Sequence, residues 1–152
     1  MTFIFEIMGK LKIAVASDHA GFEQKQAVLK FLQEQGIEFK DFGAFSTESS
    51  DYPDFAHPLS NAVSDGEFDK GITLCGSGNG INMTANKHQG IRSALCWMPE
   101  IARLARLHND ANICSLPARF ITDEEAIQIV KTFLSTDFEG GRHIARINKI
   151  PV

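Results

Sequence analysis

Short runs of apolar residues alternate with longer amphipathic stretches along almost the whole chain. This alternation constrains the fold most strongly, because it predicts one parallel sheet with right-handed crossovers and helices on both faces. The first, third and fourth runs are mostly apolar, which is typical of parallel strands covered on both faces. We therefore predict a three-layer α/β fold. The five expected strands are Lys12–Ala16, Glu38–Phe42, Gly71–Cys75, Arg92–Cys96 and Asn112–Ser115.

The stretches between these runs carry helix signals. Apolar residues from Phe22 to Leu32 fall near one helical face, and Gly36 stands where a C-cap is expected. Prolines can open two further helices, and Thr122 to Glu125 form a capping-box pattern for another. These further helices are expected to begin near Pro53, Asn79, Pro99 and Thr122, with a short last one after Gly141.

The chain has 152 residues, which is near the usual size of one domain. We expect an N-terminal extension over 1–10 and a single domain over 11–152, with Met8 as a candidate first residue of the native protein. The net charge of −4 argues against nucleic acid as a general partner. No apolar run approaches the ~20 residues needed to cross a bilayer.

The cysteines indicate a reducing compartment. There are three of them, widely spaced and without a CxxC pair, which argues against a disulfide framework and against a zinc site. We therefore expect a cytoplasmic protein. Cys96 and Cys114 have apolar neighbours and are expected to lie in the core.

A glycine-rich turn, residues 76–80, follows the third expected strand, which ends at Cys75. Its glycines let backbone N–H groups turn inward, and the next helix N-terminus adds partial positive charge. Such a turn binds an anion, either a phosphate or a developing enediolate oxygen, and favours the cysteine thiolate. It lacks both the Walker A lysine and the dinucleotide-binding spacing. In the alternative interpretation, the glycines only permit a tight turn and Cys75 is a small buried residue.

Two other pairs combine an imidazole with a polar neighbour. Asp18 and His19 directly follow the first expected strand, where they can bind a sugar hydroxyl and a phosphate, although Asp18 also suits a helix cap. His108 and Asn109 end the fourth expected helix. A helix C-terminus stabilises an imidazolium, so His108 is either an acid–base group or simply a cap.

An arginine pair lies near the end of the chain. Arg142 and Arg146 are four residues apart and share one helix face. Two guanidinium groups suit a phosphate dianion, although surface arginines at this spacing are common. Tyr52 and His57 lie near a strand end and are candidate lining residues.

Taken together, these segments resemble the ribose-5-phosphate isomerase B family, which also contains the allose-6-phosphate and galactose-6-phosphate isomerase subunits. The resemblance extends from about Leu11 to Ile147. It implies a Rossmann-like five-stranded sheet in flavodoxin-like order, and no metal or organic cofactor. It also implies a small phosphorylated sugar as substrate, and sites shared between the subunits of a homodimer or tetramer. The segments are Ser17–Gly21, Asp51–Pro53, Cys75–Gly80, Ala85–Lys87, Gly90–Arg92, His108–Asp110 and Glu139–His143.

Residue roles follow from the same resemblance. Cys75 would move a proton between C1 and C2, and His108 would assist ring opening. Ser77 and the turn amides would stabilise the enediolate, and Asp18 would contact sugar hydroxyls. The expected substrate-binding residues are His19, Gly76, Gly78, Asn79, Gly80, Asn109, Arg119, Arg142, Arg146 and Tyr52, with His19 and the three arginines on the phosphate.

Asn82, Met83 and Thr84 depart from the family pattern, in which smaller residues are expected. Cys75 favours the branch of the family that uses a cysteine base rather than a glutamate. Three alternatives stay open: a hexose-6-phosphate isomerase acting on allose or galactose phosphates, a non-catalytic phosphosugar-binding module, and a flavodoxin-like nucleotide binder.

Overall fold

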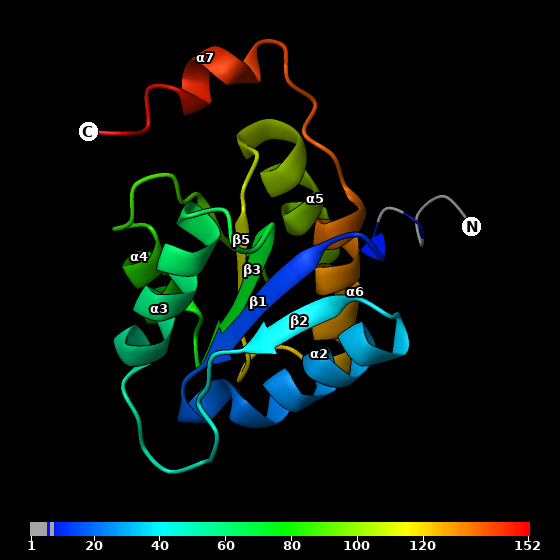
Figure 1. The fold of residues 1–152 in the computed structure, drawn as a ribbon, viewed down its shortest axis with the longest axis vertical. Helices are drawn as coiled ribbons and strands as arrows, with labels where there is room; N and C mark the ends of the chain where they lie inside the picture. The colour runs from blue at the N-terminus through cyan, green and yellow to red at the C-terminus, as the bar shows by residue number, and fades with distance from the viewer. Residues whose placement is uncertain (1–5, 7) are drawn as a thin grey trace.

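A computed structural model describes Glu6 and residues 8–152. Five parallel strands form one sheet in the order β2-β1-β3-β5-β4, with helices on both faces (Figure 1). None of the described helices is long and apolar enough to span a bilayer. The strands are β1 (Lys12–Ser17), β2 (Glu38–Asp41), β3 (Lys70–Cys75), β4 (Ser93–Leu95) and β5 (Ile113–Pro117).

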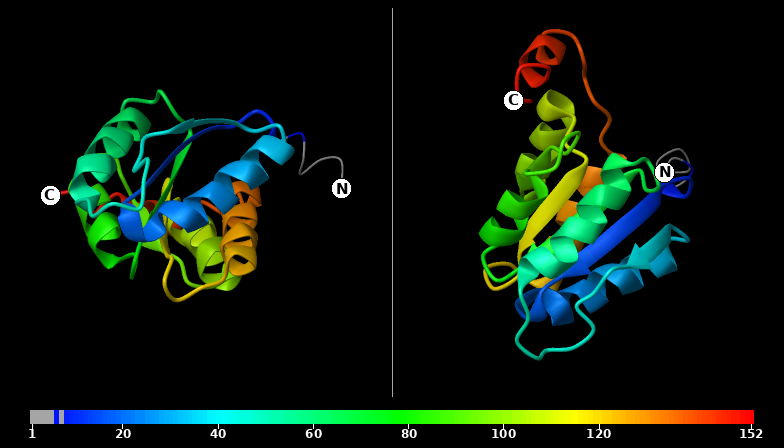
Figure 2. Two further views of the ribbon diagram at one scale, coloured as in Figure 1. Left: turned by 90° about the horizontal axis from the view of Figure 1, so that it is seen from below. Right: turned by 60° about the vertical axis from the view of Figure 1, so that its left-hand side comes forward.

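The helices form two outer layers, which the views of Figure 2 separate from the sheet. One layer packs on the main core and the other on a smaller cluster of the opposite face. The first layer holds α2 (Phe22–Glu34), α5 (Pro99–Asn109) and α6 (Asp123–Ser135). The second holds α3 (Tyr52–Ser64) and α4 (Asn79–Ala85). A 3-10 turn, η1 (His19–Gly21), follows β1, and α7 (His143–Ile147) lies beyond the sheet near α5.

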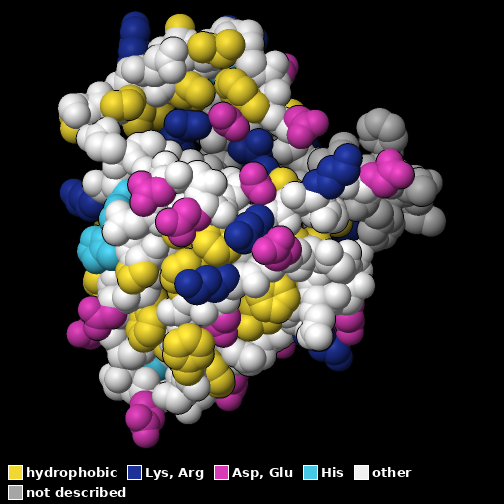
Figure 3. Space-filling view, viewed as in Figure 1, with side chains coloured by type: hydrophobic (Ala, Val, Ile, Leu, Met, Phe, Trp, Pro, Cys, Tyr) yellow, Lys and Arg dark blue, Asp and Glu magenta, His cyan; other side chains and the backbone are white. Residues whose placement is uncertain are grey.

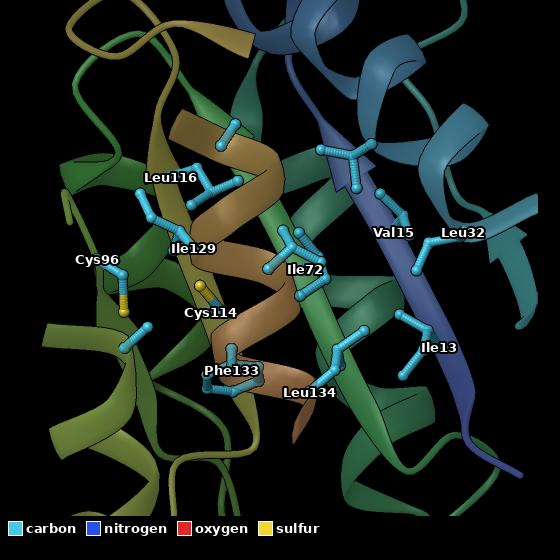
Figure 4. Close-up of a cluster of buried hydrophobic side chains, with 14 of the residues drawn as sticks. Ile13, Val15, Leu32, Ile72, Cys96, Cys114, Leu116, Ile129, Phe133 and Leu134 are labelled. Carbon is cyan, nitrogen blue, oxygen red and sulfur yellow. The ribbon is translucent and has the colours of Figure 1, made fainter. Parts of the chain in front are cut away.

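The main core lies between the sheet and the first layer of helices (Figure 4). Along β1, Ile13 and Val15 enter this core, while Ala14 and Ala16 belong to the cluster beneath α3. Side chains alternate between the faces of a strand, so β1 contributes to both clusters. Cys96 and Cys114 are fully buried in the main core, as the sequence predicted. The core also contains Leu32, Ile72, Leu116, Ile129, Phe133 and Leu134.

The flavodoxin-like strand order was wrong. That order places β4 beside β3, whereas β5 lies between them and β4 is the edge strand. The physical reason is burial: all five residues of β5 are buried, whereas the three residues of β4 are only half-buried. The faces of β4 are nevertheless covered, since Ala94 packs against the main core and α4 contacts β4. A polar Ser93 suits an edge, while the apolar β5 requires neighbours on both sides.

The local helix signals were confirmed. Helices begin at or beside the expected prolines, and α4 begins at Asn79. In the capping box, Glu125 N–H donates to Thr122 Oγ1 over 3.1 Å, and Thr122 N–H donates to Glu125 Oε2 over 2.8 Å. Most of the expected N-terminal extension falls outside the described residues. Met8, however, is buried against the main core.

The sequence did not reveal the buried lysine of α2. Lys25 is fully buried, and its Nζ donates to Asp41 Oδ1 and to the carbonyl of Ala44, both over 2.6 Å. Burial lowers the pKa of Lys25, and the hydrogen bond to Asp41 opposes that shift. The same carboxylate oxygen accepts the N–H of Gly43 over 2.9 Å. Lys25 therefore ties α2 to the start of the loop that follows β2.

We expect Lys25→Met to destabilise the fold. It leaves the Asp41 carboxylate and the Ala44 carbonyl without their cation, so the free energy of unfolding should fall by about 3 kcal/mol. Lys30→Met is the matched control. Lys30 lies on the same helix with its side chain 77% exposed, so its replacement should cost less than about 0.5 kcal/mol. Urea unfolding of the two variants measures the difference, and equal midpoints would contradict it.

Candidate functional site

The carboxyl ends of β1, β3 and β5 meet at one edge of the sheet, and candidate residues follow each of them. Cys75 is the last residue of β3 and pairs in register with Pro117 of β5. Its side chain is 4% exposed and packs with Ala56 of α3 and Ile81 of α4. The thiol therefore lies at the base of the glycine-rich turn. This turn is next to the switch point between β1 and β3, where the strand order reverses.

The turn from β5 to α6 is fixed to this glycine-rich turn by backbone hydrogen bonds. Ala118 N–H donates to the carbonyl of Cys75 over 2.9 Å, and Arg119 N–H donates to that of Gly76 over 3.0 Å. A Cβ on Gly76 would lie 3.2 Å from Arg119 Nη1. The Arg119 guanidinium therefore packs directly on the turn, which places a cation beside the expected anion site.

The remaining glycines of the turn also permit close approach. Gly78 has a φ of +77°, and a Cβ there would lie 2.4 Å from Leu95 Cδ1. A Cβ on Gly80 would lie 2.4 Å from Tyr52 Cζ. Tyr52 of α3 therefore packs on the turn. Ser77 Oγ accepts the N–H of Asn79 over 3.3 Å, and both residues are exposed at the turn.

Asp18 stands beside the same turn. Its N–H donates to the carbonyl of Leu74 over 3.2 Å, which joins the ends of β1 and β3. Its Oδ1 accepts the N–H groups of Ala20 and Gly21 over 2.9 and 3.1 Å. Asp18 therefore does cap η1, as the alternative interpretation held. Because these bonds use Oδ1, the second carboxylate oxygen is the one that can meet a sugar hydroxyl.

His19 is held by the loop between β2 and α3. Its N–H donates to Ser50 Oγ over 3.0 Å, and its Nδ1 lies 3.1 Å from both the N–H and the carbonyl oxygen of Ser50. Nδ1 accepts from the N–H in one tautomer and donates to the carbonyl in the other, and Nε2 carries a proton in the first of these. Both contacts hold the ring against the Ser50 backbone.

His108, Asn109, Arg142 and Arg146 lie at the other edge of the sheet. α5 follows β4 and runs antiparallel to the strands, so its C-terminal end, with His108 and Asn109, lies near their amino ends (Figure 1). Arg142 directly precedes α7, and Arg146 follows one turn later within it. Within one chain, the structure does not bring these residues together with Cys75.

His57 has another partner within the described part of the chain. His57, a candidate lining residue, pairs with His88 instead, with 2.7 Å between Nδ1 and Nε2. Burial, and secondarily the charge of His57, lower the pKa of His88.

Burial raises the pKa of the Cys114 thiol well above its usual value, which keeps it a neutral core group.

The departure from the expected small residues in α4 has a structural explanation. Ser93 Oγ donates to Asn82 Oδ1 over 2.6 Å, and Thr84 Oγ1 donates to the carbonyl of Gly80 over 2.8 Å. Met83 is 63% exposed and points away from the core. Asn82 thereby joins α4 to β4, and Thr84 braces the helix start, so these residues support the turn without filling it.

Comparisons with known proteins agree on one family. The family model described as Ribose/Galactose Isomerase matches residues 13–150. The ribose-5-phosphate isomerase B of Escherichia coli strain K12 is 43% identical over 139 residues, which cover 91% of this chain and 93% of that protein. A ribose 5-phosphate isomerase of Thermotoga maritima matches with a TM-score of 0.91 at 54% identity, covering 93% and 97% of the two chains. Ribose-5-phosphate isomerase B of Mycoplasma genitalium, solved with bound ribulose-5-phosphate, matches with a TM-score of 0.89 at 41% identity, covering 93% and 94%.

We expect Gly78→Ala to destabilise the turn severely. A left-handed φ costs a non-glycine residue roughly 1–2 kcal/mol, and overlap with packed neighbours adds roughly 1–3 kcal/mol. Gly66→Ala is the matched control, because Gly66 has a φ of +79° but nothing within 4 Å of its added Cβ. Denaturant unfolding should show a clearly larger loss for Gly78→Ala. Equal losses would mean that the turn relaxes freely.

Proposed function

The chain belongs to the ribose/galactose isomerase family, and from this premise we propose that it interconverts ribose 5-phosphate and ribulose 5-phosphate with Cys75 as the base. It is a sugar-phosphate isomerase, in which an aldose and a ketose exchange through a cis-enediolate. The position of Cys75 carries the proposal. It ends a buried strand at the switch point of the sheet, and the glycine-rich turn follows it directly.

The proposed chemistry begins with ring opening. The C1–O4 bond breaks, its electron pair stays on O4, and O4 takes a proton from His108. Asp18 accepts the proton that the C1 hydroxyl releases. The Cys75 thiolate then removes the proton from C2, which leaves the negative charge on O1 of the enediolate. The O2 hydroxyl passes its proton to the neighbouring O1, and the Cys75 thiol returns its proton to C1 as the C2 carbonyl forms. One base therefore serves both carbons.

The glycine-rich turn stabilises that charge. Its backbone N–H groups, together with the Ser77 hydroxyl, are aimed by the turn rather than by long flexible side chains. Fixed donors need no reorganisation when the charge develops, so they lower the barrier more than mobile groups would. Remote binding of the phosphate by His19, Arg119, Arg142 and Arg146 holds the short sugar chain in place during this step.

The division of the candidate residues between two edges of the sheet supports a shared site. Two copies that place the Cys75 edge of each against the His108 edge of the other complete two sites. Exposed apolar side chains are present for such a contact, with Trp97 and Phe120 after the strand ends and Ile144 and Ile150 around α7. Figure 3 shows hydrophobic side chains gathered at the end of the molecule that carries α7. A homodimer suffices, and a tetramer of such dimers is the alternative.

No metal ion or organic cofactor is part of this proposal, because thiolate, imidazole and fixed N–H donors supply every step. We place the enzyme in the cytoplasm, which its free cysteines at 75, 96 and 114 support. The same machinery would serve a hexose 6-phosphate, which is the alternative substrate within the family.

The first test of the proposal is Cys75→Ala. Without the base, the rate of ribulose 5-phosphate formation from ribose 5-phosphate should fall by at least about a hundredfold. Cys96→Ala is the matched control, since it removes another buried thiol and should retain turnover. Thermal melting of both variants checks that they fold.

The outcomes of this test separate the alternatives. Full activity in Cys75→Ala would contradict the base assignment. Faster wild-type turnover of allose 6-phosphate than of ribose 5-phosphate would keep the machinery and change the substrate. An inactive wild type on both sugars would favour a non-catalytic phosphosugar-binding module.

The shared site predicts complementation between two inactive variants. In a random mixture of Cys75→Ala and His108→Ala chains, half of the dimers are mixed and carry one intact site, so activity should recover to about a quarter of the wild-type value. His108→Ala mixed with Arg142→Ala is the matched control, because both changes lie at the same edge and no intact site forms. Recovery in both mixtures, or in neither, would contradict the shared arrangement.

A further inference from the structure

The segment between α6 and α7 returns to the end of α5 and brings a carboxylate to His108. Glu139 N–H donates to the carbonyl of Leu107 over 3.1 Å, which fixes this segment beside the helix end. Glu139 Oε2 then lies 3.7 Å from His108 Nε2. The same oxygen lies 3.4 Å from His143 Nε2. One carboxylate oxygen therefore faces two imidazole rings.

The two rings form a stack. The centroids of His108 and His143 are 4.4 Å apart, and their planes differ by 17°. His143 is 5% exposed, whereas the side chain of His108 is 38% exposed. The buried ring is thus a fixed platform, and the half-exposed ring on top of it would otherwise sample several rotamers.

His143 Nε2 is a buried polar atom that lacks a hydrogen-bond partner within the described part of the chain. Such atoms are rare and costly in native structures, so each one asks for an explanation. Its position opposite Glu139 Oε2 supplies one, because a small rotation of the exposed carboxylate closes the 3.4 Å gap into a hydrogen bond.

A metal site is the less suitable interpretation of this cluster. The three ligand atoms lie within 4.8 Å of one another, which is close enough for one ion. However, ring nitrogens bind a metal along their in-plane lone pairs, and nearly parallel stacked rings direct these side by side rather than to a common point. The same stack is well suited to holding one ring in a set orientation.

We propose that Glu139 and His143 are positioning residues that orient His108 for ring opening. The inference rests on the proposed function, since it presupposes that His108 protonates the ring oxygen. Glu139 holds Nε2 of His108, and His143 fixes the plane of the ring. The other nitrogen, Nδ1, is thereby turned toward the sugar. A carboxylate that accepts the Nε2–H in this way stabilises the imidazolium, which carries its second proton on Nδ1 and can give that proton to O4.

The chemistry of the substrate separates this role from a general structural one. Ribulose 5-phosphate cannot close a five-membered ring, because the O5 that would attack its C2 carbonyl carries the phosphate. Exchange of its C1 hydrogen with deuterium from D2O therefore needs only Cys75 and the enediolate site. Net conversion of ribose 5-phosphate needs ring opening as well.

The experiment compares these two rates in Glu139→Gln, His143→Ala and the wild type. Net conversion of ribose 5-phosphate should fall by about tenfold in both variants, while deuterium exchange into ribulose 5-phosphate should stay within about twofold. His143→Phe keeps a ring beneath His108 and should restore most of the conversion that His143→Ala loses. Asp137→Asn is the matched control, because it removes an exposed carboxylate from the same segment, and both of its rates should remain unchanged.

The outcomes distinguish the inference from the proposed function. Equal losses in conversion and exchange, or no loss in either, would overturn the positioning role while the wild type still isomerises the sugar. A wild type without conversion or exchange would instead contradict the proposed function itself. Thermal melting of the four variants confirms that each is folded when its rates are compared.

Discussion

The parallel pairing of β1 with β3 is the constraint on which the candidate site depends. It sets Ser17 opposite Leu74, so that Asp18 and Cys75 leave the sheet side by side. The turn η1 packs closely on β3. A Cβ on Gly21 would lie 2.7 Å from the carbonyl oxygen of Leu74, so only glycine fits there. A register shift of one residue would turn the thiol to the other face of the sheet. The chemistry of the site is therefore specified by main-chain hydrogen bonds before any side chain contributes.

Rigidity at the glycine-rich turn comes from neighbours that press on it from several sides. Tyr52 approaches from α3, Arg119 from the turn after β5, and Leu95 from the edge strand β4. Glycine is thus needed at these positions because the neighbouring atoms leave no room for a Cβ, and not only because of its backbone angles. A turn clamped in this way keeps its N–H groups aimed without a bound ligand, and such preorganisation is what a charge-stabilising site requires. The side chain of Leu95 in β4 and the backbone of Leu116 in β5 both lie against Gly78, so this clamp depends on β4 and β5 lying side by side.

The sequence predicted which segments form strands and helices, and which residues are candidates for the site, better than it predicted how these are arranged in space. Hydrophobic runs, prolines and the capping box are local signals, so strands and helix starts were found. Strand order depends on which run needs neighbours on both sides, and the spacing of β4 and β5 along the chain does not show this. Lys25 looked like an ordinary surface lysine, because its partners are 16 and 19 residues away, Asp41 at the end of β2 and Ala44 in the loop that follows. The segment from Glu139 to His143 indicates a phosphate ligand through Arg142, but spacing alone does not show that Glu139 and His143 contact His108.

The two edges of the sheet differ in how much of their geometry a single chain can set. At the carboxyl edge, Cys75, Asp18 and His19 are already held by backbone hydrogen bonds and the loop at Ser50. At the amino edge, His108 is half-exposed at the end of α5, and Arg142 and Arg146 are exposed around α7. Side chains in such positions easily lose their orientation. The buried ring of His143 and the carboxylate of Glu139 compensate for this at one position, since they restrict His108 before any contact with a second subunit. In the proposed dimer, association then has to bring together two ordered half-sites rather than to order one of them, which reduces the entropy that assembly must overcome.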